Sequence, residues 1–144
     1  MIVDADHLGS LPDQLTMVDG SFDPIHEGHI EYFRLAASLQ HKVFCNIAPD
    51  SWTANKHRVL LRQEQRAAVL DSIRYIDFVH FSSLSTLEVL RMVKPMVYAK
   101  GRDWLDRGGI PDDERELCME LGVEVVYLDS IRNSSSQILR NFSE

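Results

Sequence analysis

The stretch GSFDPIHEGH, residues Gly20–His29, is the segment that best indicates the fold, because it joins an apolar run to a segment with helical periodicity. The run LTMV at 15–18 predicts a short buried strand. Residues 29–39, HIEYFRLAASL, carry apolar side chains at helical spacing. The stretch is therefore expected to be the turn of a strand–turn–helix unit, with two histidines, His26 and His29, where the helix begins.

The same alternation continues along the rest of the chain. Strands are predicted at 15–18, 42–48, 76–81, 96–100 and 123–128, and helices at 29–39, 62–74, 85–93, 112–122 and 134–142, with arginines expected on the edges of the second helix. Parallel neighbours need crossover connections, which the helices supply. The prediction is an α/β fold with a Rossmann-like five-stranded parallel sheet and helices on both faces. Residues 1–144 are expected to form a single domain.

Composition narrows the classes of function. The chain has 144 residues, 44% of them hydrophobic and 26% charged, which is typical of a globular protein. Its formal net charge of −7 argues against a nucleic acid as partner. No apolar run approaches membrane-spanning length, and the acidic start MIVDADHLGS does not resemble a secretory signal. Cys45 and Cys118 form no CxxC pair, so we expect reduced thiols in a cytoplasmic protein.

Ligands of open α/β sheets bind beyond the carboxyl ends of the strands. That rule directs attention to four predicted loops, at 19–28, 49–58, 101–110 and 129–135. The residues with the most distinctive chemistry fall in these loops. We therefore expect a single site, built where the four loops meet.

The first loop suits an anion. A helix N-terminus offers unpaired N–H groups and partial positive charge, which favour phosphate. His26 and His29 lie one helical turn apart on the same side, and Gly28 between them lets a ligand approach the backbone. The alternative is a structural loop with two incidental histidines.

The whole stretch resembles the G-x-F-D-x-x-H-x-G-H motif of the nucleotidyltransferase superfamily, which includes cytidylyltransferases and small adenylyltransferases. The resemblance extends over residues 15–142, the expected catalytic core, and leaves 1–14 as an N-terminal extension. It implies that His26 and His29 contact phosphates and stabilise the transition state. It also implies nucleotide binding by the rest of the motif, namely Gly20, Ser21, Phe22, Asp23 and Gly28.

The second loop and the helix after it add cations. Lys56 and Arg58 follow Asp50, and without the resemblance a solvated basic loop would explain them. Sugar- and polyol-phosphate nucleotidyltransferases carry a lysine-containing loop here, so the resemblance implies that Lys56 is catalytic and that Asp50 and Arg58 bind substrate. Arg74 ends a helix, where a cation commonly stabilises the helix dipole. The similar IRYVD run of cytidylyltransferases implies instead that Arg74 approaches the substrate phosphate.

The last two loops complete the resemblance. VYAKGRDW, residues 97–104, is similar to the VKGGDY of heptose-phosphate adenylyltransferases and the MGDDW of glycerol-phosphate cytidylyltransferases, which implies nucleotide binding by Gly101 and Asp103. Arg102 departs from both patterns. NSSSQILR at 133–140 has capping-box spacing, and it also resembles the superfamily's phosphate-binding serine element. The residues implied there are Ser134, Ser135 and Ser136 for nucleotide, and Arg132 for substrate in place of an arginine that relatives carry near Asp129.

The implied reaction joins ATP or CTP to a phosphorylated sugar or polyol, of the heptose 1-phosphate or glycerol 3-phosphate type, and releases pyrophosphate. Mg²⁺ is the expected cofactor, held mainly through the nucleotide phosphates, with no metal site formed by the protein alone. A homodimer is a further expectation, and no membrane partner is expected. Two alternatives remain. One is an adenylyltransferase of cofactor biosynthesis, acting on a flavin, pantetheine-phosphate or nicotinate-type acceptor. The other is a catalytically silent nucleotide-binding module.

Overall fold

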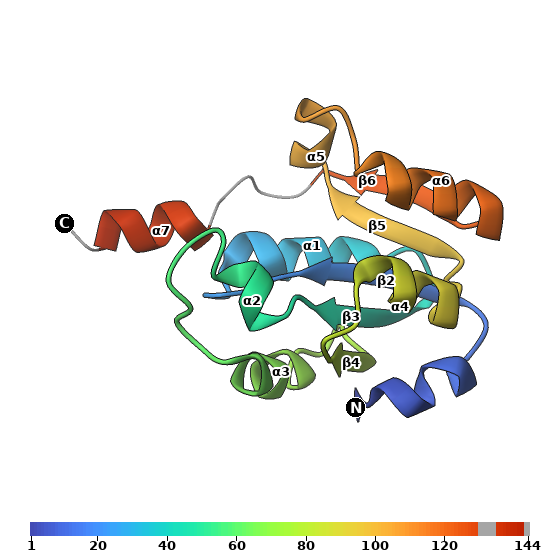
Figure 1. Cartoon of the computed structure of the whole chain (residues 1–144), viewed down its shortest axis with the longest axis horizontal. Coiled ribbons are helices and arrows are strands. Elements are labelled where there is room, and N and C mark those ends of the chain that lie inside the picture. Colours follow the sequence, from blue (N-terminus) through green and yellow to red (C-terminus); the bar gives the residue numbers. More distant parts are fainter. Residues whose placement is uncertain (130–134, 143–144) are drawn as a thin grey trace.

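A computed structural model, describing residues 1–129 and 135–142, has a single parallel sheet between two layers of helices (Figure 1). The sheet has six strands in the order β1-β4-β3-β2-β5-β6. Their bounds are β1 Ile2–Val3, β2 Leu15–Gly20, β3 Lys42–Ile47, β4 Phe78–Phe81, β5 Val97–Gly101 and β6 Glu124–Leu128. The predicted α/β class and parallel sheet are therefore confirmed, and all five predicted strands are present.

The strand count of five was wrong, because the N-terminal extension supplies a sixth strand. β1 pairs in parallel with β4, with Ile2 opposite Val79 and Val3 opposite His80. The 3-10 helix η1 (Ala5–Ser10) follows it and buries Leu8, whose side chain is 1% exposed. Residues 1–14 are thus part of the sheet and of the core.

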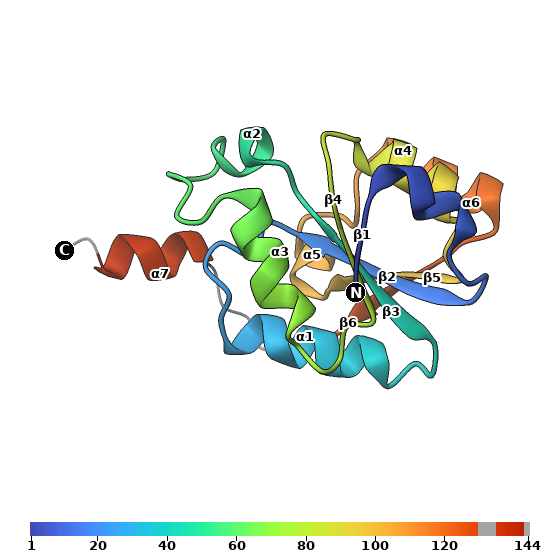
Figure 2. The same ribbon diagram turned by 90° about the horizontal axis from the view of Figure 1, so that it is seen from below.

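Helices cover both faces of the sheet, as predicted. Figure 2 shows α1 (Glu27–Ala37) and α3 (Gln63–Asp71) on one side, and η1, α4 (Thr86–Val93) and α6 (Asp112–Leu121) on the other. Each side has its own apolar cluster. Phe33, Ala36 and Leu70 pack on the first face, and Leu8, Leu90 and Leu117 pack on the second. The burial of both faces explains why the central strands read as continuous apolar runs.

The order of the strands contains one reversal, and it decides where a ligand can bind. β2 lies between β3 and β5, so successive units build outward on opposite sides of β2. At such a switch point the loops from the two neighbouring strands diverge and leave a crevice beyond their carboxyl ends. The switch point here lies between β2 and β5, so a ligand crevice is expected at that place.

Two loops that were predicted to be irregular contain short helices, α2 (Asp50–Thr53) and α5 (Asp103–Asp106). Both lie at the carboxyl edge of the sheet. The last helix, α7 (Ser135–Phe142), extends away from the sheet on the same side, at the left of Figure 1. Among the described residues, no helix has the length and apolar character needed to span a membrane.

Candidate active site

The β2–α1 loop places both motif histidines at the start of α1, where they cap the helix. His26 is the N-cap residue, and its Nδ1 accepts a hydrogen bond from the backbone N–H of Gly28, 3.1 Å away. His29 Nδ1 in turn accepts from the backbone N–H of His26 at 3.2 Å. The two rings stack with their centroids 3.7 Å apart. The two imidazoles therefore accept the backbone N–H groups at the helix start, as a serine and a glutamate do in an ordinary capping box.

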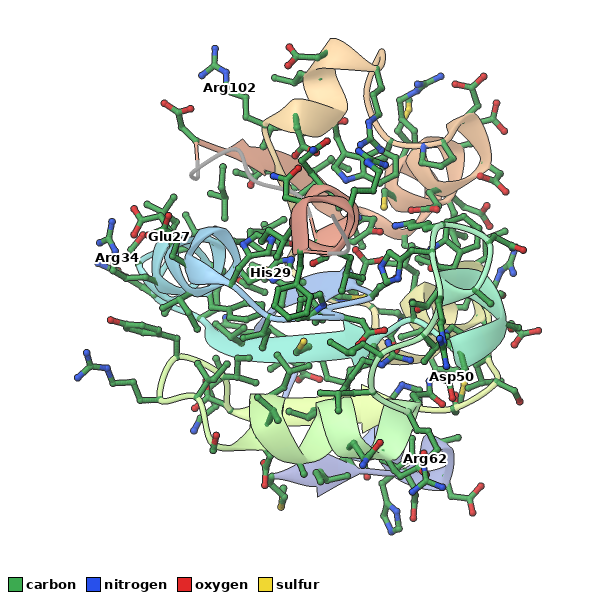
Figure 3. All side chains as sticks on the ribbon, turned by 90° about the vertical axis from the view of Figure 1, so that its left-hand side faces the viewer. Glu27, His29, Arg34, Asp50, Arg62 and Arg102 are labelled. Carbon is green, nitrogen blue, oxygen red and sulfur yellow. The ribbon has the colours of Figure 1, made fainter. Side chains whose placement is uncertain are left out.

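This cap also fixes which nitrogen of each ring carries hydrogen. A neutral imidazole has one donor nitrogen and one acceptor nitrogen. Because Nδ1 accepts a backbone N–H in both rings, Nε2 must carry the hydrogen in both. His26 Nε2 is buried and has no hydrogen-bond partner among the described residues. In Figure 3, which faces the carboxyl edge, His29 lies inward from α1, whereas Glu27 and Arg34 point outward. The pair thus offers two N–H donors to an acceptor.

Both rings are neutral near pH 7. Burial, together with the neighbouring His26 and Lys56, lowers the pKa of His29 to about 3. Burial also lowers the pKa of His26, against a smaller opposing effect of Glu27. Neutral rings donate hydrogen bonds without adding a fixed charge, which suits a group whose charge grows during reaction.

A loss of stability on mild acidification is expected from these neutral histidines. His80, buried in β4, has its pKa lowered to about 4 by burial, and His29 has its pKa lowered to about 3. In the unfolded chain both would bind a proton near pH 6.5, so the unfolded state binds more protons below that pH. Each histidine should then lower the free energy of unfolding by up to ~1.4 kcal/mol per pH unit between about pH 6.5 and its folded-state pKa. Urea unfolding of the protein and of His80→Gln at several pH values measures the slope. An equal slope in the variant would contradict this role for His80.

The same loop is held in shape by Phe22 and Asp23. Phe22 has a positive φ of 52°, and its ring contacts the His29 ring edge-on at a centroid distance of 5.1 Å. A Cβ on Gly20 would lie only 3.0 Å from the Phe22 ring, so a larger residue there would have to displace this ring. The Asp23 carboxylate accepts the backbone N–H groups of Leu60 and Leu61 at 2.7 and 2.8 Å. Asp23 therefore ties the first loop to the second, and both of its oxygens are engaged.

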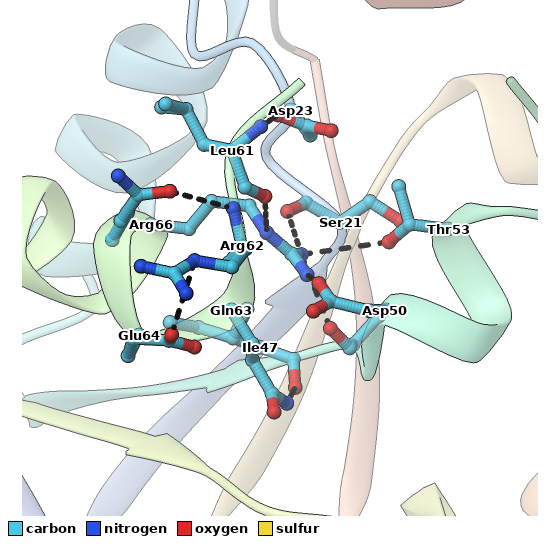
Figure 4. A network of polar contacts seen from close by, with 12 residues as sticks. Ser21, Asp23, Ile47, Asp50, Thr53, Leu61, Arg62, Gln63, Glu64 and Arg66 are labelled. Atoms are coloured by element: carbon cyan, nitrogen blue, oxygen red, sulfur yellow. Dashed lines mark hydrogen bonds and ion pairs between the residues drawn. The ribbon is translucent and has the colours of Figure 1, made fainter. Parts of the chain in front are cut away.

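Arg66 connects the loops, and its burial was not predicted from the sequence. Its side chain is 0% exposed, although α3 was expected to keep its arginines at the edges. The guanidinium donates to the backbone carbonyls of Ser21 at 2.6 Å, Ala48 at 3.1 Å and Leu61 at 3.0 Å, and it pairs with the carboxylate of Asp50 (Figure 4). Asp50 is thus engaged by Arg66, which gives it a role in the scaffold of the site.

Lys56 brings a cation to the histidines. Its charge contributes to the lowered pKa of His29, after burial and His26. Partial desolvation lowers the pKa of Lys56 itself, with Lys100 and Arg107 adding to the shift. The ammonium lies 5.7 Å from the centre of the Trp52 ring. Arg58, two residues further on, is exposed.

The β5 side of the crevice adds a second group of charges. Asp103, at the start of α5, pairs with Arg107 at 3.7 Å. Gly101 ends β5, and Arg102 is exposed and points away from the other site residues in Figure 3. Lys100 forms an ion pair with Asp19 at 2.5 Å, with its side chain 8% exposed. The Lys100–Asp19 pair was missed by sequence reasoning, although a lysine at the end of an apolar strand was a usable signal.

α7 reaches the site at its first residue. Ser135 Oγ donates to the backbone carbonyl of Pro24 at 2.6 Å, so this serine contacts the histidine loop. The candidates Arg132 and Ser134 lie outside the described residues, as does the side chain of Ser136. Among the serine candidates, Ser135 alone can be placed by its contacts.

Arg74 is not brought to this site. It lies between α3 and the start of β4, at the amino edge of the sheet, and its guanidinium packs over the Tyr75 ring at 5.3 Å. The histidine loop lies at the opposite, carboxyl edge. A role for Arg74 in catalysis would need a contact from another molecule, so the proposal below does not include it.

The site that the structure assembles thus comes from several loops at one edge. Its predicted members are Gly20, Ser21, Phe22, Asp23, His26, Gly28, His29, Asp50, Lys56, Gly101, Asp103 and Ser135. The histidine loop, the loop with Lys56 and the end of β5 with Lys100 all follow the carboxyl ends of strands. Ligands of parallel α/β folds bind at this edge.

A comparison with known protein families identifies the family of this chain. The family model for cytidylyltransferase-like proteins matches residues 17–141. This chain therefore belongs to the cytidylyltransferase-like family and is classed with the nucleotidyltransferases, as its sequence predicted.

Three relatives indicate the range of the similarity. The bifunctional protein HldE of Pelobacter propionicus is 29% identical over 139 residues, which cover 90% of this chain and 28% of that protein. The FAD synthase of Methanosarcina mazei is 33% identical over 94 residues, covering 63% of this chain and 62% of that protein. The FAD synthase of Pyrococcus horikoshii is 31% identical over 138 residues, covering 89% of this chain and 91% of that protein. The chain thus spans under a third of HldE but most of the Pyrococcus protein.

Solved structures support the fold. The lipopolysaccharide core biosynthesis protein of Thermoplasma volcanium superposes with a TM-score of 0.68 at 22% identity, covering 83% of this chain and 98% of that one. Pantoate-beta-alanine ligase of Francisella tularensis gives a TM-score of 0.68 at 15% identity, covering 100% of this chain and 73% of that one. At such identities the likeness concerns the fold alone.

Proposed function

We propose that this protein transfers a nucleotidyl group from ATP or CTP to a phosphorylated small molecule and releases pyrophosphate. The observation that carries the proposal is the pair of stacked imidazoles at the start of α1, which offers two Nε2–H donors beside Lys56. Such donors suit the oxygens of a phosphate whose negative charge increases in the transition state.

The chemistry needs positioning and charge stabilisation more than a nucleophile on the protein. A phosphate monoester is largely dianionic near neutral pH, because its second pKa is about 6. It can attack the α-phosphorus directly, forming one P–O bond as the bond to pyrophosphate breaks. In this proposal His26 and His29 donate to α-phosphate oxygens, and Lys56 binds the departing pyrophosphate. Ser135 adds the start of α7 to the same pocket.

Mg²⁺ fits this site only through its substrates. Among the described residues, no three His, Cys, Asp or Glu side chains are grouped as metal ligands. The nearby carboxylates are already engaged, since Asp23 accepts two amides, Asp50 pairs with Arg66 and Asp19 pairs with Lys100. The ion would therefore be held by nucleotide phosphates, where it would neutralise charge on the departing pyrophosphate.

For the acceptor we propose a phosphorylated sugar or polyol. The VYAKGRDW run and the Lys56 loop support this choice, as does the similarity to HldE over 90% of this chain. A flavin mononucleotide acceptor is the second candidate. It is favoured by the Pyrococcus FAD synthase, which aligns over 91% of its own length and so matches this chain in extent.

A turnover matrix tests these proposals. Pyrophosphate release is measured with ATP and CTP against heptose 1-phosphate, glycerol 3-phosphate, flavin mononucleotide and phosphopantetheine, with Mg²⁺ present. Release with one of the first two acceptors is the expected result. Release with flavin mononucleotide alone would overturn the sugar-phosphate assignment, and nucleotide binding without turnover on any acceptor would favour the silent module. Light scattering of the same sample tests the predicted homodimer.

Lys56→Met should raise the KM for the nucleoside triphosphate. A charge-assisted hydrogen bond contributes about 1.5–3 kcal/mol, so kcat/KM should fall roughly 10- to 150-fold. Lys42→Met is the matched control, because Lys42 is exposed at the amino end of β3, away from the crevice. Steady-state kinetics with varied triphosphate measures both variants. Equal values for the two would remove Lys56 from the phosphate site.

A further inference from the structure

A chain of polar side chains lies directly behind the crevice, and the mechanism above does not use it. Lys100 Nζ contacts Asp19 Oδ1 at 2.5 Å. The other oxygen of Asp19 lies 2.8 Å from the hydroxyl of Tyr98, and that hydroxyl lies 2.9 Å from Oε1 of Glu114 on α6. Tyr98 is fully buried, and Asp19 and Lys100 are nearly so. The chain thus runs from the core beneath α6 to the carboxyl ends of β2 and β5.

The number of hydrogens in this chain is constrained. The Tyr98 hydroxyl has a single hydrogen to donate, yet it lies within hydrogen-bond distance of two carboxyl groups. If both carboxyl groups were ionised, one of the two short oxygen–oxygen contacts would have no hydrogen between its atoms. Such an unsatisfied contact is costly in a buried setting. One of the carboxyl groups must therefore hold a proton.

Glu114 is the group that holds it. Asp19 already forms an ion pair with the ammonium of Lys100. Burial raises the pKa of Glu114, and the charge of Asp19 raises it further. The other groups acting on this carboxyl are Tyr98, Lys100 and Asp113, and Glu114 in turn acts on Cys118. Glu114 then donates a hydrogen bond to the Tyr98 hydroxyl, and this hydroxyl donates to Asp19. Lys100 donates to Asp19 from the other side.

The position of Lys100 connects this row of polar side chains to the candidate site. Lys100 is the last residue but one of β5, and Asp19 is the last residue but one of β2, so their ion pair spans the switch point. The ammonium lies 4.5 Å from the centre of the ring of Trp104, which is in α5 just after β5. It also acts on Lys56, whose pKa it helps to lower. Lys100 therefore lies at the carboxyl end of β5, beside Trp104 and at the edge of the sheet that carries the candidate site.

We propose that Lys100 is a further phosphate-binding residue of this site, and that the Glu114–Tyr98–Asp19 chain, with one shared proton, is the positioning device that fixes its ammonium. The inference rests on the proposed function. With Glu114 neutral, the negative charge of Asp19 is balanced by the positive charge of Lys100. Lys100 can then turn one of its N–H groups to a substrate phosphate. An ionised Glu114 would add a second negative charge behind the lysine and weaken its attraction for an anion.

The first test reads the proton directly and needs no substrate. The side-chain carboxyl carbons of the full-length protein, labelled with ¹³C-glutamate, are followed by NMR as the pH is raised. Glu116, on the same helix and exposed, is the internal control, with Glu114→Gln providing the assignment. We expect Glu114 to remain protonated at pH values where Glu116 is ionised. Ionisation of the two at the same pH would overturn the proposal.

The second test measures anion affinity by calorimetry, with inorganic pyrophosphate as the probe. Glu114→Leu should weaken binding about tenfold, because it frees the Tyr98 hydroxyl and loosens Asp19, and Glu114→Gln should restore it, because glutamine is neutral like the protonated acid. Glu116→Gln removes one charge from the same helix and is the matched control. If Glu114→Gln binds pyrophosphate as poorly as Glu114→Leu, the shared proton is not what positions Lys100.

A third variant tests Lys100 itself. Lys100→Met alone would leave Asp19 as a buried unpaired charge and could unfold the protein, so the pair Asp19→Asn with Lys100→Met removes both charges together. We expect at least a tenfold loss of pyrophosphate affinity in a folded protein, and unchanged affinity would overturn the proposal. These readouts are separate from turnover. If no acceptor reacts, the proposed function fails, while carboxyl titration and pyrophosphate binding still decide this inference.

Discussion

Arg66→Met is expected to lower the free energy of unfolding by about 3–5 kcal/mol, because three backbone carbonyls lose the donor that this fully buried side chain supplies. Methionine fills a similar volume but donates no hydrogen bond. The carbonyls of Ser21, Ala48 and Leu61 would lose their donor, and Asp50 would lose its ion-pair partner. Each buried carbonyl left without a donor costs about 1–3 kcal/mol. Urea denaturation followed by circular dichroism measures the change.

Arg62→Met is the matched control for this experiment. Arg62 is the N-cap residue of the same helix, but its side chain is 70% exposed and pairs with the exposed Glu64 at 3.3 Å. Surface ion pairs of this kind contribute about 0–1 kcal/mol. A loss at Arg66 no larger than the loss at Arg62 would mean that the loops are held by other contacts. Figure 4 shows both arginines and their partners side by side.

The second large effect is expected for catalysis. His29→Ala should remove roughly 2.7–4 kcal/mol of transition-state stabilisation, by analogy with the loss of one oxyanion donor. That change lowers kcat by about 10²- to 10³-fold. The reason is that His29 Nε2–H, fixed by the cap to His26, is one of two donors available to the α-phosphate. Single-turnover kinetics with saturating triphosphate and acceptor measures the chemical step.

Two further variants separate catalysis from helix capping. His29→Asn can still accept the backbone N–H of His26 through its side-chain oxygen, so the helix start should survive while the donor to phosphate is lost. His41→Ala removes a histidine that lies just before β3, at the amino edge of the sheet. We expect His29→Asn to lose activity like His29→Ala, and His41→Ala to keep it. Near-wild-type turnover in both His29 variants would remove this residue from the mechanism.

The regular part of the fold was predictable because its signals are local. The strands β2, β3 and β5 are runs of mostly buried side chains, and the helices between the strands show apolar periodicity. β1 was missed because two residues are too few to show any period. What makes Ile2–Val3 a strand is its neighbour β4, with Val79 N–H bonded to the carbonyl of Met1 at 2.9 Å. That pairing joins residues more than seventy positions apart in the chain.

The candidate site shows the same difference between local signals and long-range contacts. The His26–His29 arrangement lies within four residues, and the sequence revealed it. Lys100 and Asp19 are 81 positions apart, and Arg66 and Ser21 are 45 apart, so their contacts depend on the strand order. Arg74 is a different case. Its motif resembled a substrate-binding run, but a residue between a helix and the following parallel strand must lie at the amino edge.

The histidine cap also determines which ions the pair can recognise. Two stacked imidazoles invite comparison with a zinc site, where a ring nitrogen must donate its lone pair to the metal. Here the Nδ1 lone pairs of His26 and His29 are occupied by backbone amides, and hydrogen occupies the Nε2 positions. Coordination of a transition metal would require both rings to change tautomer and α1 to lose its first turn. The helix therefore protects this pair from trace metals while leaving it receptive to oxyanions.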